Sequence, residues 1–99
     1  MPKIFEYFGM VFFFYANEHD PKHVHIKQGE CENKVDLIFD NGLLMDMLFK
    51  KVGGADELPM KKQKEAREFI EVYHMQIVEK WKEFFVLHIK PRNERITKL

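Results

Sequence analysis

Residues 34–50 read KVDLIFDNGLLMDMLFK and contain the clearest structural signal in the chain. Two runs rich in apolar residues, 34–40 and 43–50, flank the dipeptide Asn41-Gly42. Asn-Gly favours the positive φ angles of a tight turn between two strands, and it is the strongest short-range signal for a hairpin. The segment therefore predicts an antiparallel hairpin that strands on its N-terminal side can extend.

Further strands are predicted before this hairpin, at 23–28, 10–15 and 3–8, where Phe, Val and Ile are frequent. Together they form an antiparallel meander of three to five strands within residues 3–50. The run at 10–15 does not alternate with polar residues, so we expect it to be buried on both faces. Phe12 and Phe14 lie on one face, and Val11, Phe13 and Tyr15 on the other. We expect a homodimer, or a small protein partner, to cover the second face.

One long helix is predicted at about 58–85, after the break at Gly53-Gly54. Its apolar residues recur at helical spacing and form one broad stripe: Ala66, Phe69, Ile70, Tyr73, Ile77, Trp81, Phe84 and Phe85. A helix packed on an antiparallel sheet makes a two-layer α+β domain. We place this single domain at residues 1–89, where the strand-like content of 86–90 allows an extra edge strand. Residues 90–99 form a basic C-terminal tail.

The composition excludes several classes of protein. The 99 residues carry 16 basic and 16 acidic side chains, and this neutral balance is unlike that of a strong non-specific nucleic-acid binder. The single cysteine excludes an internal disulfide. No apolar run is long enough to cross a bilayer, so we expect a cytoplasmic protein with no membrane partner.

The basic residues of the tail are candidate contacts to nucleic-acid phosphates. Lys90, Arg92, Arg95 and Lys98 stand against a single acidic residue, Glu94, whereas the first half of the chain is acidic. A solvated, frayed terminus explains the same charges without any partner.

Three of the five histidines lie in residues 17–25, NEHDPKHVH. His23 and His25 are two apart on a predicted strand, so they point to the same face with backbones roughly 6.5–7 Å apart. His19 lies on the loop just before, where all three imidazoles can converge. If Val24 and Ile26 share the core face with Val35, Leu37 and Phe39, the two strand histidines share the opposite face with Lys34, Asp36, Ile38 and Asp40. A carboxylate there, Asp36 or Asp40, would orient an imidazole ring.

Two kinds of chemistry fit this histidine segment. His19, His23 and His25 with an open fourth position are ligands of the type that bind catalytic zinc, or another divalent metal. Without a metal, two of these histidines can act as acid and base in the cleavage of RNA phosphodiesters. In that role Asn17 would bond a phosphate or the loop, and Glu18 or Asp36 would orient a ring. A loop held by histidine-to-backbone hydrogen bonds is the structural alternative.

The segment 14–25, FYANEHDPKHVH, resembles the signature of the bacterial family known as domain of unknown function 4160. Its members typically open with M-P-x-I, here residues 1–4, and end their helix with a W-x-E-F-F-like sequence, here residues 81–85. Ala16 departs from the serine usual in the family, so any role of that hydroxyl is absent here. The last fourteen residues resemble a tail found in only some members.

The resemblance implies a small intracellular bacterial protein from a suspected toxin–antitoxin pair, whose partner is a second small protein encoded nearby. Two hypotheses follow from it. In the first, the chain is an RNA-directed, toxin-like enzyme centred on the histidines. In the second, it is a non-catalytic antitoxin, adaptor or metal-binding module in which the histidine loop is structural.

Overall fold

The turn at Asn41 and Gly42 joins β4 (Cys31–Asp40) to β5 (Leu43–Lys51), as the hairpin signal predicts. The computed structural model describes residues 2–16 and 22–99. In it the two turn residues have φ angles of 52° and 79°. Positive φ at both central positions is the geometry of the type I′ turn, whose twist matches that of the flanking strands.

The meander continues through β1 (Lys3–Tyr7), β2 (Met10–Phe13) and β3 (His23–Gln28). The strands form one six-stranded sheet in the order β5-β4-β3-β2-β1-β6. Neighbours from β1 to β5 are antiparallel, so the predicted α+β class and its five-stranded meander are confirmed. The sixth strand, β6 (Glu94–Ile96), pairs with β1 in the parallel direction.

The prediction of an extra edge strand at 86–90 is wrong, because β6 forms this edge of the sheet instead. The helix ends at Phe85, and the chain turns away from it through His88, whose φ is 57°. The amide of Ile89 donates to the carbonyl of Glu83 at 2.7 Å, so this donor serves the turn and not a sheet. Part of the segment assigned to a tail, 90–99, therefore lies in the sheet.

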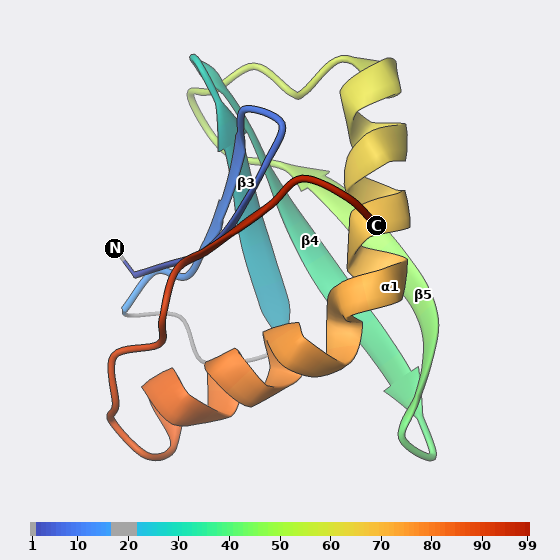
Figure 1. Ribbon diagram of the computed structural model, residues 1–99. Coiled ribbons are helices and arrows are strands. Elements are labelled where there is room, and N and C mark those ends of the chain that lie inside the picture. The colour runs from blue at the N-terminus through green and yellow to red at the C-terminus, as the bar shows by residue number, and fades with distance from the viewer. Residues whose placement is uncertain (1, 17–21) are drawn as a thin grey trace.

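Helix α1 (Met60–Phe85) covers one face of the sheet with the predicted apolar stripe. Phe69 is fully buried at its centre, and its ring centroid lies 4.6 Å from that of Phe12 and 4.9 Å from that of Tyr7. Trp81 lies on the stripe as predicted, but it is only half-buried. Figure 1 shows that the helix bends near its middle, so its two halves follow different parts of the sheet. No helix in the described part of the chain is long and apolar enough to span a membrane.

The start of the helix is tied to β4 by a buried side chain, Asn33. Its Oδ1 accepts a hydrogen bond from the amide of Leu58 at 2.8 Å, and its Nδ2 donates to Glu57 Oε1 at 3.1 Å. The same Nδ2 donates to the carbonyl of Lys50 at 3.1 Å. These bonds connect three segments and set where the helix enters the fold.

The end of the chain is tied to the helix by a buried lysine, Lys80. Its Nζ donates to the carbonyl of Arg92 at 2.6 Å and to Glu94 Oε1 at 3.1 Å. The ammonium also lies 4.9 Å from the centroid of the Phe5 ring. A buried charge needs such partners, so Lys80 holds β6 beside β1.

In the part of the chain that the structure describes, no helix covers the opposite face of the sheet, and we call this face the helix-free side. Strand alternation directs five buried residues of β2, β3 and β4 to this side: Phe13, His23, His25, Glu32 and Asp36. Four of the five are polar or charged. Whatever chemistry the histidines perform therefore depends on the hydrogen bonds made here.

Candidate functional site

A carboxylate holds one of the two strand histidines. His25 Nδ1 lies 3.2 Å from Glu32 Oε2, and the Tyr15 hydroxyl donates to the same oxygen at 3.1 Å. A carboxylate only accepts hydrogen bonds, so this contact places the proton of the imidazole on Nδ1. The network thus fixes both the tautomer and the orientation of the ring.

Aromatic rings pack around His25 and restrict it further. The Phe13 ring stacks on the imidazole with centroids 5.5 Å apart, and Tyr15 meets it edge-on at 4.5 Å. His23 also meets it edge-on, with ring centroids 5.4 Å apart. His23 is 0% exposed and His25 is 3% exposed. The two imidazoles are therefore neighbours, as the spacing on the strand predicts, but they are buried.

The second carboxylate of the site, Asp36, is held by lysines. Asp36 lies directly across from His23 in the pairing of β3 with β4, so the predicted register is confirmed. Its carboxylate accepts from Lys50 Nζ at 2.7 Å, and Lys34 Nζ lies 3.9 Å away. Both lysine side chains reach solvent, whereas the carboxylate is buried. Two positive charges thus stand beside the histidine pair.

Three of the predicted site residues, Asn17, Glu18 and His19, lie outside the described residues. In the part of the chain that the structure does describe, no group of three His, Cys, Asp or Glu is placed to hold a metal ion. A carboxylate on one ring nitrogen, as Glu32 is on His25 Nδ1, is the arrangement that orients metal-binding histidines in proteins.

The basic residues of the tail occupy separate positions. Lys90 and Arg92 line a pocket beside Pro2, near the end of the helix. Arg95 lies on β6, where its guanidinium is 3.4 Å from Glu6 Oε2. Lys98 is exposed beyond the last strand. The four cations do not form one cluster.

Glu32, Tyr15 and Lys50 belong to the site, and sequence reasoning did not single them out. The register argument proposed Asp36 or Asp40 as the carboxylate that orients a histidine, but Glu32 is the one bonded to His25. Glu32 lies two residues before Lys34 on the same strand, so strand alternation places it on the side of the histidines. Lys50 pairs with Lys34 on the neighbouring strand, so it lies on that side as well.

Comparison with known proteins identifies the chain at the level of its family. No curated protein and no solved structure matches it. The profile of one family, described as "Domain of unknown function (DUF4160)", matches residues 9–82. This range includes both strand histidines, Glu32, Asp36 and Lys50, and it covers well over half of the chain. The chain therefore belongs to the DUF4160 family.

Proposed function

We propose that the helix-free side of this DUF4160 protein is an acid–base site that cleaves RNA. The observation that carries the proposal is the pair of adjacent imidazoles, one held by Glu32 and Tyr15, with two lysines beside them. Cleavage of a phosphodiester needs one group that removes a proton, another that supplies one, and positive charge near the phosphate. The cluster contains each of these.

The reaction assigns different roles to the two histidines. With its proton on Nδ1, His25 has the lone pair on Nε2 and removes the proton of a ribose 2′-hydroxyl. The 2′ oxygen attacks the adjacent phosphorus, and the bond from phosphorus to the 5′ oxygen breaks. Protonated His23 gives its proton to that leaving oxygen. The products are a 2′,3′-cyclic phosphate and a 5′-hydroxyl, and neither water nor a metal is consumed.

Lys34 and Lys50 are the nearest cations for the scissile phosphate. Each lies on a strand next to or one beyond β3, and the two balance the carboxylates of Glu32 and Asp36 in the same cluster. Arg95 and Lys98 supply outer phosphate contacts in this proposal. The protein would then be the toxin-like member of a pair, whose cleavage of RNA halts translation in the cell that makes it.

The test compares a ribonucleotide oligomer with the deoxyribonucleotide of the same sequence, in the presence of a chelator. We expect cleavage of the ribonucleotide alone, with cyclic phosphate ends detected by mass spectrometry. Replacing one proton-transfer group typically costs about 10²–10⁴-fold in rate. His25→Phe keeps a ring against Phe13 and removes the proton chemistry, so it is the informative variant.

The matched control is His74→Ala, because His74 lies on the helix, away from the two strand histidines, with its Nδ1 2.8 Å from the carbonyl of Glu71. It should cleave like the parent protein. Expression of the parent, His25→Phe and His74→Ala in cells then tests growth arrest. Equal cleavage by His25→Phe and the parent would overturn the proposal, as would an intact ribonucleotide in every arm.

A second candidate function is a non-catalytic antitoxin, adaptor or metal-binding module. The nearly complete burial of His23 and His25 favours it, since a buried imidazole held by a carboxylate, as His25 is by Glu32, stabilises a fold. This candidate predicts no cleavage by the parent and no growth arrest. Zinc content separates its two forms: a metal-binding module retains zinc after dialysis and loses it in His23→Ala, whereas an adaptor contains none in either protein.

A further inference from the structure

A groove with one apolar end and one basic end lies near the end of the helix, away from the histidine cluster. It consists of two adjoining pockets of about 700 and 640 Å³ that share Pro2 and Lys90. We call it the terminal groove. Pro2, Phe84, Phe85 and Ile89 line its apolar end, and Lys3, Lys90 and Arg92 line its basic end.

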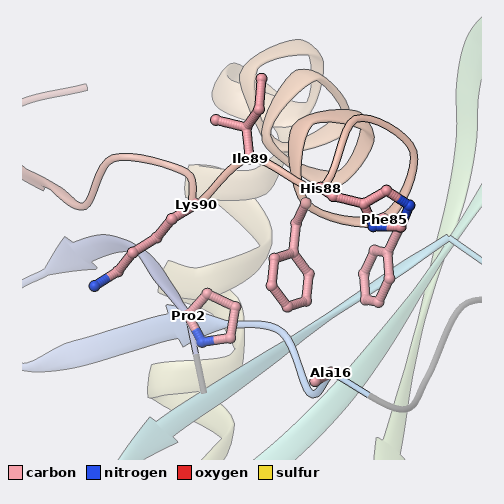
Figure 2. Close-up of a pocket in the computed structure, with 7 residues that line it drawn as sticks. Pro2, Ala16, Phe85, His88, Ile89 and Lys90 are labelled. Atoms are coloured by element: carbon pink, nitrogen blue, oxygen red, sulfur yellow. The ribbon is translucent and has the colours of Figure 1, made fainter.

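We infer that the terminal groove binds an acidic segment of a partner protein that carries apolar anchor side chains. Figure 2 shows the Phe85 ring and Pro2 beside the apolar pocket, whereas the Ile89 side chain points away from them and Lys90 extends to one side. The charge of the groove, the packing of its rings and its position relative to the family match support this occupant.

The charge of the groove is unbalanced in a chain whose net charge is zero. Lys3, Lys90 and Arg92 contribute three cations, and among the described lining residues there is no carboxylate. Concentrated charge of one sign attracts a partner of the opposite sign and orients it. The occupant should therefore be acidic where it meets the basic end.

The rings at the apolar end favour a peptide over a nucleic acid. Phe84 stacks on Phe14 with centroids 6.2 Å apart and meets Phe85 edge-on at 4.8 Å. One face of Phe84 therefore packs against a protein ring and both rings are only partly exposed, so they offer little platform for the stacked bases that single-stranded nucleic acids require. The neighbouring side chains are aliphatic and exposed: Val86 60%, Leu87 59% and Ile89 53%. Aliphatic surface of this kind is buried by apolar side chains of another protein.

The groove lies mostly outside the residues that the family profile matches, which run from 9 to 82, and only Ala16 of its lining falls inside that range. Ile89 and two of the three cations, Lys90 and Arg92, follow the end of the match, whereas Pro2, Phe84 and Phe85 stand in segments typical of the family. We therefore expect only those relatives that carry a similar basic tail to share this partner. No residue that lines the groove takes part in the acid–base proposal, so the two proposals can fail separately.

The test uses the fluorescence of Trp81, the only tryptophan of the chain, whose ring lies 5.0 Å from Phe85. The probe is a short synthetic peptide in which glutamate alternates with leucine and phenylalanine. Its counterpart has glutamine in place of each glutamate. We expect the acidic peptide to bind and to shift the emission, and the glutamine peptide to bind about tenfold more weakly or not at all.

Lys90→Glu should weaken binding of the acidic peptide about tenfold, because one attraction becomes a repulsion. Lys98→Glu makes the same change of charge outside the groove and should alter binding less than about twofold. Both sites are exposed, and thermal unfolding confirms that both variants fold. Equal binding of the two peptides, or equal losses in the two variants, would overturn the inference. The inference would also fail if an oligouridylate bound more strongly than the acidic peptide. It would fail too if sedimentation experiments showed that a second copy of the chain fills the groove.

Discussion

The two sides of the sheet bury their side chains by different means. On the side that faces α1, the buried residues are almost all apolar, and Phe69 packs among the rings of Phe5, Tyr7 and Phe12. On the helix-free side, buried aromatic rings lie next to buried imidazoles and carboxylates. The first arrangement is non-directional and depends on filled volume, whereas the second depends on particular hydrogen bonds and ion pairs. Substitutions on the two sides should therefore destabilise the protein for different reasons.

The largest effect is expected from Phe69→Ala, on the helix side. Removal of a fully buried aromatic side chain leaves a cavity and typically costs about 3–5 kcal/mol. Denaturant unfolding measures the loss. Val72→Ala is the control, because Val72 lies on the same helix and is 54% exposed. A Phe69→Ala protein as stable as its Val72→Ala counterpart would show that filled volume does not govern this side.

The next largest effect is expected from Lys50→Ala, on the helix-free side. The side chain of Lys50 is 53% exposed, but its partner Asp36 is only 4% exposed, so the substitution leaves a buried carboxylate with weaker compensation. An unsatisfied buried polar group costs about 1–3 kcal/mol. Lys51→Ala removes the neighbouring exposed lysine and should change stability by about 0.5 kcal/mol or less. Equal effects of the two lysines would contradict the dependence on specific partners.

A smaller effect is expected from Trp81→Phe, where the helix side is less completely covered. Among the residues that the structure describes, no acceptor bonds the buried indole Nε1, so the substitution removes no hydrogen bond to them and keeps an aromatic ring beside Phe85. Such a swap should cost less than about 1.5 kcal/mol. Calorimetric unfolding checks it, and a cost near that of Phe69→Ala would show that Trp81 anchors the core.

The smallest effect is expected from Leu48→Ser, at the solvent-exposed end of the helix-free side. Leu48 is 42% exposed within one chain, and exposed sites usually change stability by about 0.5 kcal/mol or less. Melting temperatures at rising protein concentration extend the test to the expected homodimer. If a second copy covers this end, the loss caused by Leu48→Ser will grow with concentration. A loss that stays constant would count against a dimer formed here.

Much of the fold could be predicted because its signals are local. The Asn41-Gly42 turn, the alternation along 23–28 and the helical stripe each depend on residues close in sequence, and each prediction is confirmed. A register shift between Ile38 and Phe39 leaves Met45 61% exposed although Met47, two residues on, is buried, and no local pattern reveals such a shift. The edge strand predicted at 86–90 is absent, because strand-like composition does not reveal which backbone groups a neighbouring strand can reach.

The candidate site could be predicted only in part. Spacing places His23 and His25 on one face, and register places Asp36 across from His23, as the structure confirms. The choice of Glu32 as the partner of His25 needed the packing of Tyr15 and Phe13 around the ring. Side-chain rotamers and distances decide such a choice, and a strand pattern contains neither.

The sequence by itself determined the order of the strands in the meander, the apolar face of the helix and the common side of the two histidines. The two faces follow from periods of 3.6 and 2 residues, and the order of the strands follows from the turn signal and the short connections between them. Only the tertiary structure decided which side chains pack around His23 and His25, that Lys80 holds β6 beside β1, and that the terminal groove collects cations from both ends of the chain. These features join residues distant in sequence, and such contacts form only when the folded chain compensates the entropy of closing the loops between them.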